Sequence, residues 1–164
     1  LGLASSGLHT NGYSLARKAL FDVGGHTLSE KLQDGRSIGE ALAEPHRSYL
    51  NSLWPAVQRK DIQGLVHITG SGFQGNIPRV LPKNLDVIID RTAWDVPEIF
   101  NLIQQTGDVE KDEMYSTFNM GIGMLVFIEE AKAEALKAEF EAAGEQVCYA
   151  GKVIAGEGKV LFQD

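Results

Sequence analysis

The segment GIGMLVFI, residues 121–128, is followed directly by EEAKAEALKAEFEAAG, residues 129–144, and this pair decides the fold class. The first run is almost wholly apolar, as expected for a central strand that is covered on both faces. The second run carries an apolar face at helical spacing, made of Ala133, Leu136, Phe140 and Ala143. Gly144 follows as a helix stop. A buried strand that leads into an amphipathic helix indicates a layered α/β domain.

Strands and helices alternate along the rest of the chain. Apolar runs predict further strands at residues 1–4, 64–69, 85–90, 146–154 and 159–162. Periodicity and stop signals predict helices at 13–23, between 35 and Pro45, at 49–60, within 70–82, at 95–107 and at 109–116. The last two strands are joined through Gly156-Glu157-Gly158, so we expect them to pair antiparallel and to make the sheet mixed. The expected architecture is a three-layer α/β/α domain with a mixed sheet.

Composition and charge limit the possible partners. The 164 residues are enough for one domain with a substantial core. The net charge of −7 argues against nucleic acid as a partner, because phosphate backbones are held by clustered Lys and Arg. No apolar run is long enough for a membrane span, so we expect no membrane contact. The only cysteine is Cys148, which excludes an intrachain disulfide and fits a reducing compartment, the cytoplasm.

Two loops of one kind are the main functional candidates. In residues 1–20 and again in residues 64–80, a short apolar strand runs into a Gly/Ser-rich turn and then into a helix. The free N–H groups of a helix N-terminus suit a phosphate or carboxylate, and glycine lets the backbone approach it. The side chains that add polar groups to these loops are Ser5, Ser6, His9, Thr10 and Asn11 in the first, and His67, Thr69, Ser71, Asn76 and Arg79 in the second.

Plain structural roles are open for the same residues. Asn11 is placed to cap the helix that starts at residue 13, and Asp95 with Glu98 forms a sequence pattern typical of a capping box. His67 lies in a predicted strand and is equally compatible with a core position. His46 follows Pro45 in a turn, where ligand contact and simple solvation are equally good interpretations. No phosphate-loop, nucleophile-elbow or metal-binding motif occurs, so we expect no metal ligands in this chain.

Four longer motifs resemble one enzyme family. These are GLASSGLHTNGYSLARK (2–18), EPHRSYL (44–50), GLVHITGSGFQGNIPRVLP (64–82) and FNMGIGM (118–124). In this order and at these separations they resemble the aminoimidazole ribonucleotide synthetases, also called phosphoribosylformylglycinamidine cyclo-ligases or the PurM family. The resemblance is clear from Leu1 to about Gly123, and the rest of the chain agrees in layout.

The resemblance implies a fold and a reaction. The family converts formylglycinamidine ribonucleotide and ATP to aminoimidazole ribonucleotide, ADP and phosphate in purine biosynthesis. Its members have two domains and form homodimers largely through the N-terminal domain, which supplies most contacts to ATP and Mg²⁺. Residues 1–164 resemble the C-terminal domain alone, a three-layer unit that is partly ferredoxin-like and forms one wall of the active-site cleft. We therefore interpret the sequence as part of a longer chain and expect it to be inactive by itself.

The resemblance also implies a set of site residues. His9 and His67 are expected to polarise or exchange protons with the amide and amidine groups of the ribonucleotide. The expected substrate- and phosphate-binding residues are Ser5, Ser6, Gly7, Asn11, Thr69, Gly70, Ser71, Gly72, Asn76 and Arg79. The family usually has glycine where this chain has Ser71, which raises the question whether that position needs a positive φ.

Two other interpretations stay open at this point. Related enzymes of the same superfamily include formylglycinamidine ribonucleotide synthetase, selenophosphate synthetase, thiamine-phosphate kinase and a hydrogenase maturation factor, which share the fold but differ in the loops. A non-catalytic module that binds a phosphorylated ligand or a partner protein is the alternative from another class.

Overall fold

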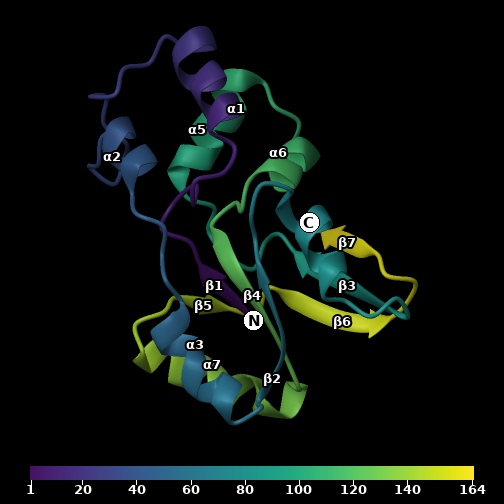
Figure 1. The fold of residues 1–164 in the computed structure, drawn as a ribbon. Helices are drawn as coiled ribbons and strands as arrows, with labels where there is room; N and C mark the ends of the chain where they lie inside the picture. Colours follow the sequence, from purple (N-terminus) through teal and green to yellow (C-terminus); the bar gives the residue numbers. More distant parts are fainter.

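The computed structural model describes residues 1–164, and its seven strands form two sheets (Figure 1). The first sheet has the order β2-β4-β1-β5 and is antiparallel throughout. Its strands are β2 (Ile62–His67), β4 (Ile122–Ile128), β1 (Gly2–Ala4) and β5 (Val147–Cys148). The second sheet has the order β6-β3-β7, from β6 (Gly151–Ala155), β3 (Leu85–Asp90) and β7 (Val160–Gln163).

Ten helical segments accompany the two sheets. They are α1 (Tyr13–Arg17), η1 (Lys18–Val23), α2 (Ile38–Ala43), α3 (Leu50–Gln58), α4 (Gly72–Asn76), η2 (Ile77–Arg79), α5 (Glu98–Gly107), α6 (Lys111–Thr117), η3 (Glu130–Lys132) and α7 (Ala133–Ala142). Helices α3 and α7 lie together against one face, whereas α1 and α5 lie beyond the opposite end of the strands (Figure 1). None of the helices combines the length and the apolarity that a transmembrane passage needs.

Strand β4 is the central strand that its composition predicts, lying between β2 and β1. Met124 and Val126 point into a small core with α3 and α7, where Leu53, Leu136 and Phe140 are buried. Leu125 and Phe127 alternate to the other face and pack into the larger core, which includes Val87 and Ile89 of the second sheet. The strand is therefore apolar on both faces because each face has its own core.

The α/β class is confirmed, and one sheet is mixed as predicted. The strands divide over two sheets, however, and the predicted antiparallel pairing of the last two strands is wrong. Strand β3 lies between β6 and β7, antiparallel to β6 and parallel to β7. The predicted strand 146–154 is interrupted after Cys148: β5 stays in the first sheet and β6 begins the second. Asp86 accepts hydrogen bonds of 2.7 Å from the backbone N–H groups of Glu157 and Lys159, which holds the β6–β7 connection across the end of β3.

Both predicted helix caps are also wrong. The residue at the N-cap of α1 is Gly12, with φ +72°, and the amide of Asn11 is turned toward the carbonyl of His9 instead. Helix α5 begins after Pro97 without a side-chain cap, and Glu98 accepts a hydrogen bond from the backbone N–H of Gln33. In both places a distant or backward contact satisfies the polar side chain better than the local helix end does.

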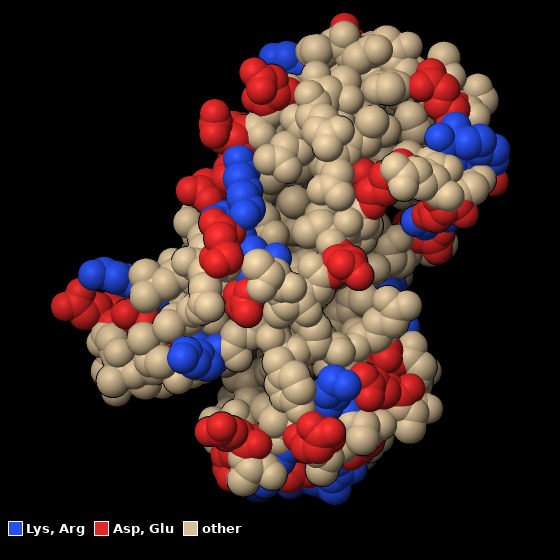
Figure 2. Space-filling model, turned by 180° about the vertical axis from the view of Figure 1, so that it is seen from behind, with Lys and Arg blue, Asp and Glu red and all other residues tan.

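Charged side chains lie interspersed on the face seen from behind in Figure 2, with acidic and basic groups next to each other. That face offers no extended basic surface of the kind that holds a phosphate backbone. The surface charge follows the acidic balance of the chain, which has 22 Asp and Glu against 15 Lys and Arg.

Candidate functional site

The two Gly/Ser-rich loops lie against each other. A Cβ atom at Gly70 of the second loop would lie 3.2 Å from Oδ1 of Asn11 in the first loop. The rings of His9 and His67 have their centroids 6.2 Å apart. The two loops therefore adjoin both at Asn11 and Gly70 and at the two histidines. The two loops that the sequence singled out separately are thus parts of one site.

The first loop holds His9 in a left-handed backbone conformation. His9 has φ +51° and Thr10 has φ +64°, and two such non-glycine residues in succession store strain of about 1–3 kcal/mol each. The carbonyl of His9 accepts hydrogen bonds from the Thr10 hydroxyl (2.6 Å) and from the Asn11 amide (2.7 Å). These two local bonds stabilise the conformation, and they explain why Asn11 does not cap the helix.

The imidazole of His9 is buried, with 1% of its surface exposed. Its Nε2 lies 3.0 Å from the backbone N of Ser6, which can only donate, so Nε2 accepts and the neutral ring carries its proton on Nδ1. Burial, together with the nearby His46, His67 and Arg47, lowers the pKa of His9 to about 4. His9 is therefore neutral at physiological pH. Its Nδ1 is buried without a hydrogen-bond partner.

His46 also lies in the site. From the sequence, ligand contact and simple solvation were equally good interpretations of this residue. Its ring stacks on His9 with centroids 4.1 Å apart, and its Nε2 lies 2.9 Å from Nε2 of His67. Burial and the proximity of His46 lower the pKa of His67. His46 comes from the connection between α2 and α3, and no spacing in the sequence relates that connection to the ends of β1 and β2.

The segment that carries His46 is anchored on both sides. The carbonyl of Pro45 accepts a 2.6 Å hydrogen bond from the Ser6 hydroxyl. Arg47 forms a 2.9 Å ion pair with the buried carboxylate of Glu145 and donates to the carbonyl of Gly144 (2.8 Å). These contacts tie the 45–47 segment to the first loop and to the end of α7.

The second loop is built around Gly72 and Asn76. Gly72 has φ +55°, and a Cβ there would lie 1.9 Å from the carbonyl oxygen of Tyr115. Ser71 has φ −124°, so the position where the family usually has glycine does not require a positive φ. The buried amide of Asn76 accepts from the Thr69 hydroxyl (3.0 Å) and donates to the carbonyl of Gly72 (2.7 Å), so both side chains brace the loop.

Arg79 lies at the open edge of the second loop. Its guanidinium donates a 3.1 Å hydrogen bond to the Ser71 hydroxyl, and the residue is exposed. Four of its five N–H groups remain free for another acceptor, because this is the one hydrogen bond that the guanidinium makes. This arrangement suits an anion at the loop edge.

Asn119 is a structural member of the site that the sequence reasoning missed. Its buried side chain accepts from the Ser5 hydroxyl (2.9 Å) and from the backbone N–H of Gly121 (2.9 Å), and it donates to the carbonyl of Gly7 (2.8 Å). Asn119 thereby fixes the first loop to the start of β4. Its only sequence signal is its place within the quoted motif FNMGIGM.

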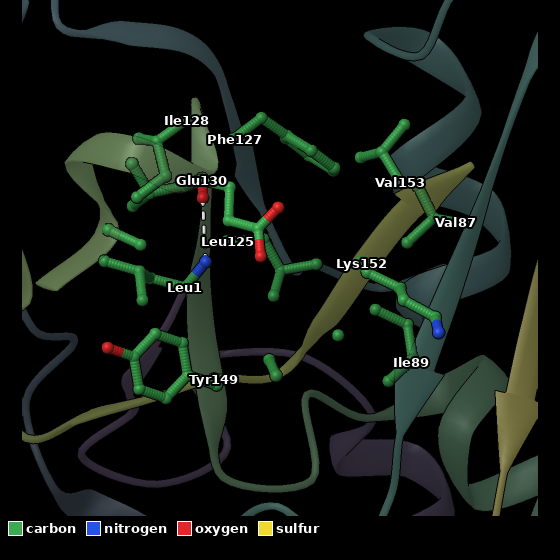
Figure 3. A pocket seen from close by; sticks show the side chains of 14 residues that line it. Leu1, Val87, Ile89, Leu125, Phe127, Ile128, Glu130, Tyr149, Lys152 and Val153 are labelled. Carbon is green, nitrogen blue, oxygen red and sulfur yellow. Dashed lines mark hydrogen bonds between the residues drawn. The ribbon is translucent and has the colours of Figure 1, made fainter. Parts of the chain in front are cut away.

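A separate apolar groove of about 470 Å³ lies between the two sheets and contains none of these residues (Figure 3). Leu1, Leu125, Phe127 and Ile128 line one side, and Val87, Ile89 and Val153 line the other. Most of its lining residues are hydrophobic, and Glu130, Tyr149 and Lys152 add polar groups.

Comparisons with known proteins identify the family. The family model described as "AIR synthase related protein, C-terminal domain" matches residues 1–164, and the chain belongs to this family. Among solved structures, the thiamine-monophosphate kinase from Stenotrophomonas maltophilia K279a has a TM-score of 0.61 at 16% identity, over 99% of this chain and 50% of that one. The structure of tt0281 from Thermus thermophilus has a TM-score of 0.57 at 19% identity, over 98% and 48%. These two likenesses concern the fold.

Curated relatives are more similar in sequence. The phosphoribosylformylglycinamidine cyclo-ligase of Desulfotalea psychrophila is 44% identical over 154 residues, which are 93% of this chain and 43% of the relative. The protein of the same name from Alkaliphilus metalliredigens is 40% identical over 163 residues, which are 99% of this chain and 47% of the relative. The resemblance to the cyclo-ligases seen in the motifs is confirmed, and the chain spans slightly less than half the length of these relatives.

Proposed function

We propose that residues 1–164 form the C-terminal domain of a phosphoribosylformylglycinamidine cyclo-ligase. In this proposal the whole protein converts formylglycinamidine ribonucleotide and ATP to aminoimidazole ribonucleotide, ADP and phosphate in the cytoplasm. The observation that carries the proposal is that the two family loops lie against each other and bring His9 and His67 together. The similarity to relatives of that name over nearly the whole chain supports it.

His67 is the better placed of the two predicted catalytic histidines. It is half-buried at the end of β2, and its lowered pKa leaves it neutral and able to accept a proton at physiological pH. His9 is fully buried, and its Nε2 already accepts the Ser6 N–H. We therefore assign proton exchange with the amide or amidine to His67 and a positioning role to His9.

The second loop is our candidate for the phosphate of the ribonucleotide. Ser71 and the exposed Arg79 lie together at its edge, and the positive φ of Gly72 turns the backbone there. A guanidinium that keeps free N–H groups is suited to bind phosphate in a bidentate way. The first loop, braced by Asn119, then contacts the reacting half of the substrate.

The loop residues do not fit Mg²⁺. The ion prefers carboxylate, phosphate and water oxygens, and the loops carry imidazole, hydroxyl and amide groups without a carboxylate. In our proposal the ATP and Mg²⁺ contacts, and the homodimer contact, belong mostly to an N-terminal domain. This chain alone is accordingly expected to form no product.

The test uses the full-length protein. His67→Ala is expected to lower substrate-dependent ADP release by at least about 100-fold, the range of general acid–base catalysis, while thermal unfolding changes little. The matched control is His26→Ala, because His26 is the one histidine outside the site and contacts Glu30 at 2.7 Å. Unchanged turnover in His67→Ala would refute the catalytic role. Tight ribonucleotide binding without any turnover in the wild type would favour the binding-module alternative.

A further inference from the structure

Three of the four histidines of the chain form one cluster. We call His9, His46 and His67 the histidine cluster; one ring nitrogen from each lies within 4.8 Å of the other two. They come from three separate segments: the loop after β1, the α2–α3 connection and the end of β2. No carboxylate belongs to the cluster. Three imidazoles from separate segments therefore meet at one place without a carboxylate among them.

We propose that the histidine cluster binds one divalent transition-metal ion, and that Zn²⁺ is the best match. Imidazole nitrogen is a preferred ligand of Zn²⁺, and three histidines with an open fourth position make a known kind of zinc site. Zn–N bonds of about 2.0–2.1 Å in a tetrahedron put the nitrogens about 3.3 Å apart. The Nε2 atoms of His46 and His67 lie 2.9 Å apart and the three ring nitrogens all lie within 4.8 Å of one another, so the rings have to adjust to admit the ion at this spacing.

One ring nitrogen of His9 has no hydrogen-bond partner, and this is evidence for a bound ion that is independent of the clustering. Its Nδ1 is buried and has no partner, and a buried polar atom without a partner needs an explanation such as an ion. Ligation through Nδ1 moves the proton of the neutral ring to Nε2, where the Ser6 hydroxyl oxygen 3.0 Å away can accept it, and the Ser6 backbone N–H then loses Nε2 as its acceptor. The ring is also held in place over Gly123, where a Cβ would lie 2.7 Å from His9 Cε1. In the stack with His46 the two ring planes are only 17° apart, so their in-plane lone pairs lie side by side and His46 has to rotate to share one ion with His9. A fixed ring reduces the conformational entropy that metal binding has to remove.

His46 is the residue on which the site depends. It is exposed and lies on a connection between helices, so its ring can shift without disturbing the core. Without its Nε2 only two imidazoles remain, which is too few for a zinc site of the three-ligand kind. The competing explanation is a His46–His67 hydrogen bond that binds no ion, and metal titration separates the two.

The consequence for function follows from the position of the cluster. A bound ion leaves one position open to water or to an anionic oxygen, on the same wall that we propose for the ribonucleotide. Zn²⁺ is therefore expected to compete with the substrate, although its binding does not depend on which reaction the whole protein performs.

The test titrates Co²⁺ and Zn²⁺ into the purified 164-residue chain without an affinity tag. We expect one ion per chain, with the visible absorption bands of tetrahedral Co²⁺ and displacement of Co²⁺ by Zn²⁺. His46→Asn should weaken binding by more than about 10-fold, since even outer-shell changes cost 10–100-fold in metal affinity. His26→Asn is the matched control and should bind as the wild type does.

The outcomes are decisive in either direction. Absence of tetrahedral Co²⁺ bands in the wild type, or an affinity unchanged by His46→Asn, would overturn the proposal. Far-UV circular dichroism checks that His46→Asn is folded, and the wild-type spectrum decides the matter by itself if it is not. Cyclo-ligase turnover by the full-length protein in Mg²⁺ without transition metals tests the proposed function separately, so the two failures are distinguishable.

Discussion

His9 lies directly over the backbone of Gly123, and the fit leaves no room for a side chain on β4. A Cβ at residue 123 would lie 2.7 Å from Cε1 of His9 and 2.0 Å from the hydroxyl oxygen of Tyr49, which itself donates a 2.8 Å hydrogen bond to the carbonyl of Ala4. One glycine of the central strand therefore determines where the buried histidine of the site can be.

Gly123→Ala is accordingly expected to displace His9 and Tyr49 and to destabilise the chain by about 1–3 kcal/mol, the usual cost of overpacking a core. Urea unfolding followed by circular dichroism measures this. Gly64→Ala in β2 is the matched strand control, because the nearest atom there is Cγ1 of the exposed Val80 at 3.0 Å. Equal unfolding midpoints for the two variants would contradict the packing argument.

Asn119→Ala should loosen the first loop. It removes the acceptor for the Ser5 hydroxyl, in a part-buried contact, and the donor to the carbonyl of Gly7, in a buried one. Leaving such groups unpaired costs about 1–3 kcal/mol. Chemical denaturation gives the loss, and Asn101→Ala, which removes only one long contact of 3.4 Å at an exposed site, should be nearly neutral. A stability loss in Asn101→Ala as large as in Asn119→Ala would show that the brace is unimportant.

Substitutions at two neighbouring positions of the second loop, Ser71 and Gly72, should differ strongly in their effect on stability. Ser71→Gly is expected to change stability by less than about 1 kcal/mol, because Ser71 has an ordinary negative φ and loses only one hydroxyl contact. Gly72→Ala is expected to disrupt the loop, because its Cβ would collide with the carbonyl oxygen of Tyr115. Thermal unfolding compares both variants with the wild type. A strongly destabilised Ser71→Gly would mean that the hydroxyl matters more than the backbone.

Stability should depend on pH through Asp86. Hydrogen bonds from the backbone N–H groups of Lys159 and Glu157 lower the pKa of Asp86 below its ordinary value of 3.8. A lowered folded-state pKa means that the unfolded chain binds the proton more readily, so the contribution is present above about pH 4 and is lost as pH falls through the folded-state value. The wild type should therefore be more stable than Asp86→Asn at pH 7, and the difference should shrink toward pH 3. A difference independent of pH would exclude this cause.

Elements with strong local periodicity were predictable from the sequence. The strand at 121–128 and the helix that follows carry their burial pattern within a few residues, and both are found. The break after Cys148 was not predictable, because residues 146–154 read as one apolar run, and the division depends on β3 taking β6 as its neighbour. The caps at Asn11 and Asp95 failed for different reasons: Glu98 contacts the backbone of Gln33, which is far away in the sequence, whereas Asn11 contacts the nearby carbonyl of His9, which the left-handed conformation of residues 9 and 10 presents to it.

The sequence by itself determined the α/β class, the family and the two loops that carry His9 and His67, because these features depend on residue types that lie close together in the sequence. Only the tertiary structure decided that the loops touch, that His46 completes the histidine cluster and that Asn119 braces the first loop. Those contacts join segments 21 to 114 residues apart. Distance along the chain carries no information about such pairs until the two cores on either side of β4 have brought them together.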